Sequence, residues 1–325
     1  MQLKKITAVV VMAVLLAGCA DANAAASTPT PTAIPTPAAT ATPVPTPSPT
    51  PVPTTPPEPT PEPYFTDEEQ VTVDAENGYW SYSSPTLWVE IHRVFDEEKT
   101  VTYYAAEVRV KPGETERGGF STPDRPGGNS TALYKIAKYY QAVLAVNGDF
   151  LDHHSEDPKG VIIRDDIVFA DDGENTTLAF MPDGTLRVVA AGELTADELL
   201  AQGVKNAFSF GPTLINDGVI QEGLDKHYLR KKNPRCAVGM IDPYHYMLIV
   251  VDGRDDGYST GMTLVELADL FASYGCEVAY NLDGGQSATM TFMGENLNQY
   301  GGSHTGQRGV PDSLMFGTSE LVPAS

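Results

Sequence analysis

Residues 247–285 read MLIVVDGRDDGYSTGMTLVELADLFASYGCEVAYNLDGG, and this stretch decides the fold. The apolar runs MLIVV and EVAY are typical of buried strands. Between them, Thr263 and Glu266 have the spacing of a capping box, apolar residues follow at helical intervals, and Gly275 is a typical stop. The segment therefore predicts a strand, a loop, a helix and a second strand.

A helix that connects two strands in this way makes them run parallel, in a right-handed crossover. Parallel strands end at the same edge of a sheet, so we expect Asp252 and Asp283 to share one edge, where ligands usually bind. A third polar tip, Asn147-Gly148-Asp149, follows the apolar run AVLAV and a helix predicted over 131–140. Spacing alone leaves the position of that strand open.

The other segments favour an α+β or mixed α/β fold with mixed sheets, an N-terminal hairpin and at least one right-handed crossover. The hairpin is predicted from two alternating runs, 86–94 and 101–110, joined by FDEEK. A Gly-rich loop is expected over 118–128. Further strands are predicted at 161–164, 176–181, 186–190, 207–215, 236–241 and 313–317, and a second capping-box helix at 195–200.

The N-terminus predicts export. Lys4 and Lys5 precede a short apolar stretch over 6–16, which ends in Leu-Ala-Gly-Cys at Cys19. This pattern indicates a signal peptide over 1–19, and its end resembles a bacterial lipoprotein signal, in which Cys19 becomes lipidated. The alternative is an ordinary secretory signal with a coincidental cysteine. Either way, we expect an extracytoplasmic protein, anchored by lipid to the bacterial cell membrane in the first case.

Residues 20–63 form a Thr/Pro-rich stretch that predicts a disordered linker. At roughly 3.1 Å per residue, such a linker could extend on the order of 100 Å. Residues 64–325 are long enough for one large domain. The formal net charge of −22 argues against nucleic acid and anionic lipid headgroups as partners. Cys236 and Cys276 could form a disulfide in an exported protein, and the sequence leaves that open.

No cofactor is predicted, and a divalent metal is not supported. His153 and His154 are adjacent, and neighbouring side chains usually point apart. Asp252 to Gly257 fails as an EF-hand because Arg254 stands where an oxygen ligand is needed. Ser209 is not in a G-x-S-x-G motif, so it does not indicate a serine hydrolase.

The motifs NGDF, FSFGPTLI, NPRCAVG, LIVVDGR, YNLDGGQSATM and QRGVPDSLMFG occur in this order. Together they resemble the phosphodiester glycosidase family over about residues 85–318, and the stretch from Asn281 to Gly285 is the most specific. The resemblance implies a hydrolase of sugar-1-phosphodiesters or related glycan linkages, acting on cell-wall or exopolysaccharide material. It also implies that Asp149 joins the other two tips. Cys236 and Gln286 depart from the family pattern, and both concern substrate detail.

The residue chemistry is compatible with that reaction. The leaving group is a phosphate monoester and a weak base, so the site needs charge stabilisation more than acid assistance. Arg235, Arg254 and Arg308 could hold the phosphate, although the basic stretch 226–235 is equally well read as a solvated loop. Asp149, Asp252 and Asp283 are the candidates for nucleophile, general base or ligand of the sugar hydroxyls. The sequence does not assign these roles among them, and any of the three could instead be a structural carboxylate. The remaining candidate substrate contacts are Asn147, Ser209, Gly211, Asn281, Gly284 and Gly285.

Two alternatives remain at this point. A non-catalytic polysaccharide-binding module would use the same sheet edge, with aromatic side chains for sugar stacking. The candidates for stacking are Tyr79, Trp80, Tyr82 and Trp88. A metal-dependent phosphoesterase would break the P–O bond instead of the C–O bond. The identity of the sugar and of the group attached to the phosphate is not encoded in a recognisable motif.

Overall fold

The computed structural model describes residues 64–112, 117–120, 130–150, 160–299 and 308–324, which all lie in a compact unit spanning residues 59–325. The predicted signal peptide with Cys19, the linker over 20–63 and the pair His153 and His154 lie outside the described residues. Within the described ranges, no helix is both long and apolar enough to cross a membrane.

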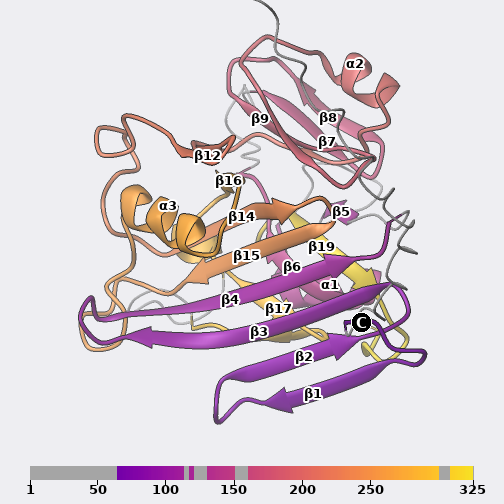
Figure 1. Ribbon diagram of the computed structural model, residues 1–325, viewed down its shortest axis with the longest axis vertical. Coiled ribbons are helices and arrows are strands. Elements are labelled where there is room, and N and C mark those ends of the chain that lie inside the picture. Colours follow the sequence, from indigo (N-terminus) through magenta and orange to yellow (C-terminus); the bar gives the residue numbers. More distant parts are fainter. Residues whose placement is uncertain (1–63, 113–116, 121–129, 151–159, 300–307, 325) are drawn as a thin grey trace, which may run out of the picture. The chain divides into compact units, whose positions relative to one another are not determined.

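Nine strands form the largest sheet, and every neighbouring pair in it is antiparallel (Figure 1). In spatial order they are β1 (Gln70–Asp74), β2 (Tyr79–Ser83), β3 (Leu87–Asp96), β4 (Val101–Val110), β15 (His245–Val251), β14 (Arg235–Asp242), β16 (Val278–Asn281), β12 (Thr213–Asn216) and β13 (Val219–Ile220). The predicted hairpin is confirmed as β3 and β4, which pair along their whole length.

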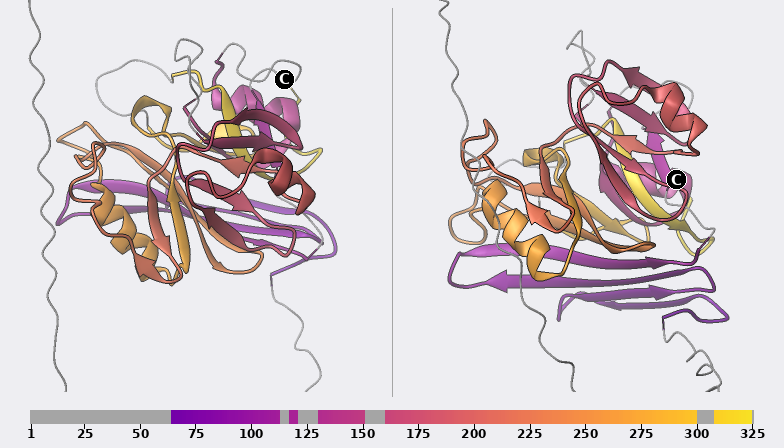
Figure 2. Two further views of the ribbon diagram at one scale, coloured as in Figure 1. Left: turned by 90° about the horizontal axis from the view of Figure 1, so that it is seen from above. Right: turned by 45° about the horizontal axis from the view of Figure 1, so that its top comes forward.

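Two five-stranded sheets complete the fold, and their neighbouring pairs are antiparallel as well (Figure 2). The second sheet contains β10 (Leu186–Val189), β9 (Thr177–Phe180), β11 (Ala207–Phe208), β7 (Val161–Arg164) and β8 (Ile167–Asp171). The third contains β18 (Glu295–Asn296), β17 (Met290–Phe292), β6 (Ala142–Asn147), β19 (Asp312–Thr318) and β5 (Arg117–Phe120). The helices are α1 (Leu133–Tyr140), α2 (Ala196–Ala201), α3 (Leu264–Ser273) and the short 3-10 helix η1 (Gly285–Ser287).

The predicted crossover is present in a modified form. β14 lies between β15 and β16 and is antiparallel to both, so the strands that flank α3 run in the same direction without pairing with each other. The expectation of mixed sheets was therefore wrong for the described strands, whose pairs are all antiparallel. β14 directly precedes β15 in the chain and forms a hairpin with it, and it takes the position beside β16 that a direct parallel pair would give to β15. The right-handedness of the crossover stays a prediction.

The interposed strand still keeps both polar tips on one edge of the sheet. Arg235 at the start of β14 pairs with Val251 at the end of β15, and Ala237 pairs with Asn281 at the end of β16. Asp252 follows Val251 directly. The carboxyl ends of two strands and the amino end of a third therefore meet at this edge.

Both faces of the central strands are buried, which explains why an antiparallel sheet contains continuous apolar runs. In β15, Leu248 and Val250 pack into the core shared by the three sheets, whereas Ile249 and Val251 pack under α3. Alternate side chains of a strand point to opposite faces, so an apolar residue is needed at every position.

Two predicted helix starts are confirmed as capping boxes. In α3 the Glu266 amide donates to the Thr263 hydroxyl at 3.1 Å, and the Thr263 amide donates to the Glu266 carboxylate at 2.8 Å. Thr195 and Glu198 make the same pair of bonds at the start of α2. Each box satisfies backbone donors that a helix start leaves without partners.

Several local predictions were wrong. Residues 118–120 of the predicted Gly-rich loop belong to strand β5, and the rest of that loop lies outside the described residues. The run AFSFGPTLI is divided between β11 of the second sheet and β12 of the first. Trp80 and Tyr82 are buried in the shared core, so they cannot stack on a sugar. Cys236 and Cys276 are both free and buried, which answers the open question of a disulfide between them.

Candidate functional site

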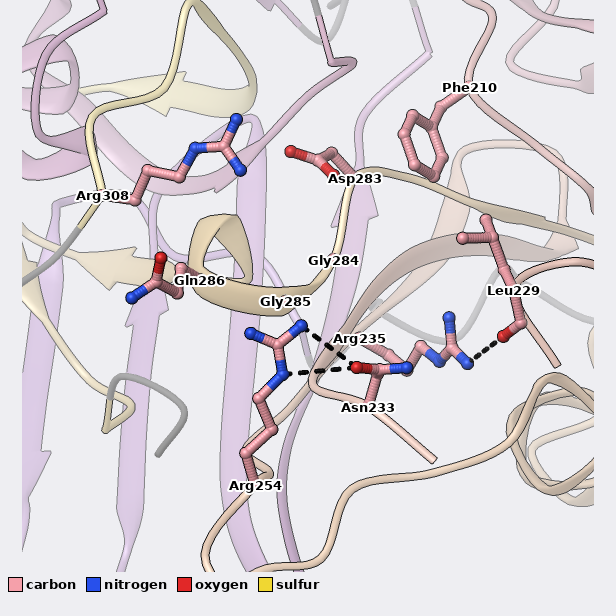
Figure 3. A pocket seen from close by; sticks show the side chains of 10 residues that line it. All are labelled: Phe210, Leu229, Asn233, Arg235, Arg254, Asp283, Gly284, Gly285, Gln286 and Arg308. Carbon is pink, nitrogen blue, oxygen red and sulfur yellow. Dashed lines mark hydrogen bonds between the residues drawn. The ribbon is translucent and has the colours of Figure 1, made fainter. Parts of the chain in front are cut away.

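A pocket of about 290 Å³ lies at the edge where β15 and β16 end and β14 begins (Figure 3). Three guanidinium groups and one carboxylate contribute its charged surface. The lining residues are Phe210, Leu229, Asn233, Arg235, Arg254, Asp283, Gly284, Gly285, Gln286 and Arg308.

Asp283 is the carboxylate of the pocket, and its backbone is held on both sides by the turn after β6. The Asp283 amide donates to the Gly148 carbonyl at 3.1 Å, and the Asn147 side-chain amide donates to the Asp283 carbonyl at 2.7 Å. Burial raises the pKa of Asp283 to about 6, while the Ser287 hydroxyl and the Arg308 charge act in the opposite direction. Asp283 is therefore mostly ionised at neutral pH.

Glycine is required after Asp283 because the chain passes close to β14. A side chain at Gly284 would meet the Pro234 carbonyl at 2.7 Å. Gly285 has a φ of +63° and donates its amide to the same carbonyl at 3.0 Å. A left-handed φ strains other residues, so the Asn-Leu-Asp-Gly-Gly stretch is constrained by backbone geometry as well as by chemistry.

Arg235 is the first residue of β14, and its side chain lines the pocket. It is 3% exposed, and its guanidinium donates to three backbone carbonyls, those of Met262, Leu229 and Lys231, at 2.9, 2.6 and 2.6 Å. Burial, together with the charge of Arg254, lowers the pKa of Arg235 to about 10. Within the part of the chain that the structure describes, no carboxylate lies within ion-pair distance of this guanidinium.

Two further guanidinium groups line the same pocket. Arg254 has a left-handed φ of +62° and donates through Nε and Nη2 to the Asn233 side-chain oxygen at 3.3 and 3.1 Å. Arg308 stacks over the Phe150 ring at 5.0 Å and lies close enough to Asp283 to lower its pKa. All three arginines predicted from the sequence therefore surround one cavity.

Asp252 lies at the expected edge but does not line the pocket. It is 1% exposed, and it accepts hydrogen bonds from the Tyr258 hydroxyl, the Asn298 side chain and the Gln299 amide at 2.9, 2.9 and 3.2 Å. These donors use both carboxylate oxygens. The contacts fix two loops to the sheet, and a catalytic role for Asp252 stays a prediction.

Asp149 and Ser209 are also buried outside the pocket lining. Asp149 forms an ion pair with Arg164 at 2.6 Å and accepts the Ser209 amide at 3.0 Å. The Ser209 hydroxyl donates to the Thr176 carbonyl at 3.0 Å. Of the three aspartates, Asp283 is the one that lines the pocket.

The remaining predicted contacts shape the backbone around the pocket. Asn281 and Gly211 bind each other reciprocally, with the Gly211 amide donating to the Asn281 carbonyl at 3.1 Å and the Asn281 side chain donating to the Gly211 carbonyl at 2.7 Å. This pair lies beside Phe210, which lines the pocket. Together with Asn147, these residues position the site through the main chain.

Sequence reasoning missed several residues of the site. Phe210, Leu229 and Asn233 lie in or beside motifs that were recognised, yet nothing in the pattern showed which side chains face the cavity. Arg164 and Asp312 were also missed. The available signal was a charged residue at the end of an apolar strand, VIIR, and at the start of another, DSLMFG.

No three His, Cys, Asp or Glu side chains gather into a possible metal site among the described residues. The two free cysteines do not change this, because burial raises the pKa of both thiols, and thiolates are the forms that bind metals.

We expect the free energy of unfolding to fall as the pH rises from about 5 to about 7.5. Burial raises the pKa of Asp252 and Asp283 to about 6 and also raises that of Asp312. The folded protein therefore holds more protons than the unfolded chain in this range, and raising the pH removes them at a cost. Urea unfolding at both pH values measures the difference.

Groups with shifts of the opposite kind leave this expectation intact. Carboxyl groups with a lowered pKa, such as Glu107, contribute below about 4.5, outside the tested range. Burial lowers the pKa of His227, so this group makes the free energy of unfolding rise with pH below about 6.5. It is one group, whereas three aspartates act in the other direction. Greater stability at pH 7.5 than at pH 5 would contradict the prediction.

The fold and the pocket define an α+β protein, mostly sheet, with a positively charged pocket beside one buried carboxylate. The chain belongs to the phosphodiester glycosidase family, because the model of that family matches residues 140–317, more than half of the chain. The resemblance seen in the sequence motifs is thereby confirmed.

One curated protein is similar in sequence to part of this chain. The SPbeta prophage-derived uncharacterized protein YomE of Bacillus subtilis (strain 168) is 32% identical over 193 residues, which cover 57% of this chain and 29% of that protein. The chain thus spans less than a third of the length of this relative.

Two solved structures share the fold. The catalytic domain of zebrafish N-acetylglucosamine-1-phosphodiester alpha-N-acetylglucosaminidase, auto-inhibited by its pro-peptide, has a TM-score of 0.59 and 24% identity over 76% of this chain and 87% of that one. A hypothetical protein from Synechocystis has a TM-score of 0.55 and 13% identity over 71% and 62% of the two chains.

Proposed function

We propose that this protein is a hydrolase that cleaves the bond between the anomeric carbon and the phosphate of a sugar-1-phosphodiester. Arg235 carries the proposal, because its buried guanidinium opens into the pocket and binds backbone carbonyls only. Arg254 adds a second positive charge close by. A buried charge is costly unless an opposite charge offsets it, and guanidinium groups bind phosphate well.

The formal charges of the pocket favour the product of this reaction over its substrate. Three guanidinium groups and one ionised carboxylate leave an excess of two positive charges. A phosphodiester carries one negative charge, and the departing phosphate monoester carries nearly two at neutral pH. Electrostatic stabilisation therefore grows as the C–O bond breaks, which is the condition for lowering the barrier.

Asp283 would act at the sugar. The departing phosphate is a weak base, so little acid assistance is needed, and one ionised carboxylate near the anomeric carbon can serve as nucleophile or as base. Among the described residues, Asp283 is the carboxylate that lines the pocket. The family assignment supports the reaction, as does the name of the zebrafish enzyme, a glycosidase of an N-acetylglucosamine-1-phosphodiester.

Oxygen tracing tests the proposal. The purified protein is incubated with sugar-1-phosphodiesters in water enriched in oxygen-18, and the products are analysed by mass spectrometry. Cleavage of the C–O bond places the label on the sugar. A label on the phosphate would replace the proposal with a phosphoesterase, and binding without turnover of any such substrate would replace it with a binding module.

We also propose that the enzyme is a lipid-anchored, extracytoplasmic protein that acts on cell-wall or exopolysaccharide material. The Leu-Ala-Gly-Cys ending of the signal and the Thr/Pro-rich stretch support this. Replacing Cys19 with Ala is expected to move the protein from the membrane fraction to the soluble fraction, because the acyl chains supply most of the attachment. Unchanged membrane association of the variant in cell fractionation would rule out the lipid anchor.

A further inference from the structure

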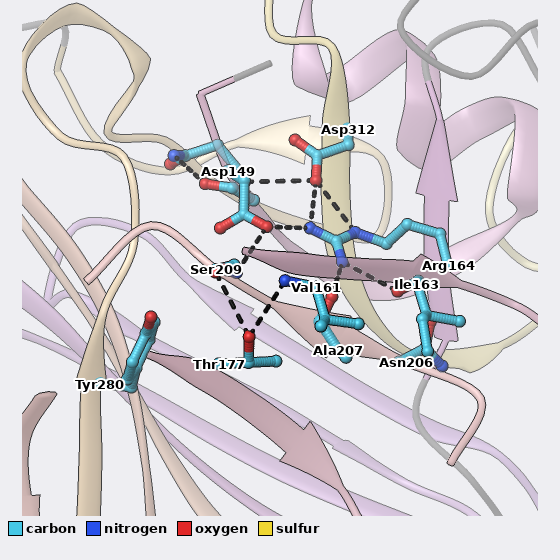
Figure 4. A network of polar contacts seen from close by, with 12 residues as sticks. Asp149, Val161, Ile163, Arg164, Thr177, Asn206, Ala207, Ser209, Tyr280 and Asp312 are labelled. Atoms are coloured by element: carbon cyan, nitrogen blue, oxygen red, sulfur yellow. Dashed lines mark hydrogen bonds and ion pairs between the residues drawn. The ribbon is translucent and has the colours of Figure 1, made fainter. Parts of the chain in front are cut away.

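Arg164 lies fully buried between two carboxylates, next to the segment that holds Asp283 (Figure 4). Its Nη2 donates to Asp149 at 2.6 Å and to Asp312 at 2.5 Å, and its Nε donates to Asp312 at 2.9 Å. Neither carboxylate is more than 2% exposed. We name Asp149, Arg164 and Asp312 the Arg164 triad.

The Arg164 guanidinium has no spare donor. Its Nη1 donates to the carbonyls of Ile163 and Ala207, so that all five N–H groups are engaged. The group also stacks on the Phe208 ring at 3.4 Å. Arg164 therefore connects β7 and β11 of the second sheet to the end of β6 and the start of β19 in the third.

The Arg164 triad fixes the same turn that clamps Asp283. The Asp149 amide donates to the Asp312 carboxylate at 3.2 Å, so the triad holds both the side chain and the backbone of Asp149. The two preceding residues, Asn147 and Gly148, make the bonds to the carbonyl and the amide of Asp283. Gly148 has no room for a side chain because Asp312 lies against it.

Stability alone does not account for three ionisable groups at this place. Burying charges is costly, and apolar side chains of similar volume usually stabilise a core as well or better. A guanidinium group fixes the orientation of its partners, because it binds planar carboxylates in a defined geometry. The charge of Asp149 also reaches the pocket, since it contributes to raising the pKa of Asp283 after burial.

We propose that the Arg164 triad is a positioning unit, which sets the location and orientation of Asp283 in the pocket by fixing the turn from Asn147 to Asp149. The triad does not touch the pocket itself. The catalytic part of this inference rests on the proposed glycosidase function, whereas the effect on the Asp283 backbone does not.

Replacing Arg164 with Lys tests the proposal. Lysine keeps the charge but has three donors and no planar fork, so it cannot bridge both carboxylates and both carbonyls. We expect kcat to fall about 100-fold, because a misplacement of roughly 1 Å has that effect on a reacting group. The Kd for inorganic phosphate should stay within about threefold, since Arg235 and Arg254 are held by other segments.

Amide hydrogen exchange provides a readout that needs no turnover. The amide of Asp283 should exchange faster in Arg164→Lys and in Asp312→Asn, because its bond to Gly148 loosens. Leu267→Ala in α3 serves as a control of lowered stability, since Leu267 is fully buried on the opposite face of the first sheet. The control should retain the kcat of the original protein and local protection at Asp283.

The outcomes separate the two proposals. Faster exchange at Asp283 without any turnover by the original protein would support the positioning unit and remove the glycosidase. Unchanged exchange at Asp283 in both triad variants would overturn the positioning unit. So would an equal loss of kcat in Leu267→Ala, because the effect would then follow from stability alone.

Discussion

Asp283→Asn is expected to lower kcat by about 100- to 10,000-fold, the range in which a positioned acid, base or nucleophile contributes. The substitution keeps the size of the side chain and removes its charge. It leaves the backbone bonds of Asp283 to Asn147 and Gly148 in place, so the protein should fold. Steady-state turnover of a sugar-1-phosphodiester measures the effect.

The pH dependence gives a second reading of the same variant. Since burial raises the pKa of Asp283 to about 6 in the unliganded protein, kcat/KM of the original protein should fall below that pH as the carboxylate becomes protonated. The residual activity of Asp283→Asn should lack this acidic limb. Asp269→Asn removes one charge from the exposed face of α3 and serves as the control. Near-normal kcat in Asp283→Asn would place the chemistry on another residue.

Arg235→Lys is expected to lower kcat/KM by about 100- to 1000-fold, the effect of losing one fixed donor at a developing negative charge. The Arg235 fork binds three carbonyls at one side and still presents nitrogen to the pocket. A lysine ammonium has one nitrogen and cannot do both. Calorimetric titration with phosphate, together with turnover, separates loss of binding from loss of the chemical step.

Arg254→Lys is the matched control for that variant. Arg254 lines the same pocket, but it is exposed, and among the described residues its guanidinium donates hydrogen bonds to Asn233 only. We expect its replacement to cost less than that of Arg235, because water already solvates the group. Equal effects of the two substitutions would indicate that charge alone matters, and that the buried geometry of Arg235 does not.

The part of the fold that the sequence predicted well is local. The capping boxes at Thr195 and Thr263, the hairpin of β3 and β4, and the apolar runs around α3 depend on residues near one another in the chain. The position of β14 between β15 and β16 depends on its pairing with β16, from which β15 and α3 separate it in the chain. No periodicity encodes such a pairing, so the sheets were expected to be mixed and are antiparallel.

The candidate site shows the same division. Motif order pointed to the arginines and to Asp283, and all of them line the pocket. An acidic tip after a strand does not reveal where its side chain points, which is why Asp252 was grouped with Asp283. The family resemblance added Asp149 to that group. Arg164 and Asp312 are 148 residues apart in sequence, and their contact could not be inferred from either segment.

The pocket is positively charged and the chain as a whole is negatively charged, and this difference affects the rate at which an anionic substrate associates. The chain has a formal net charge of −22, so its long-range field repels an anion that its arginines attract at short range. Dilute salt should screen the distant repulsion first, because the Debye length is about 10 Å at 0.1 M and buried charges are screened less. The association rate of an anionic substrate should therefore rise with ionic strength before it declines, the reverse of electrostatic steering.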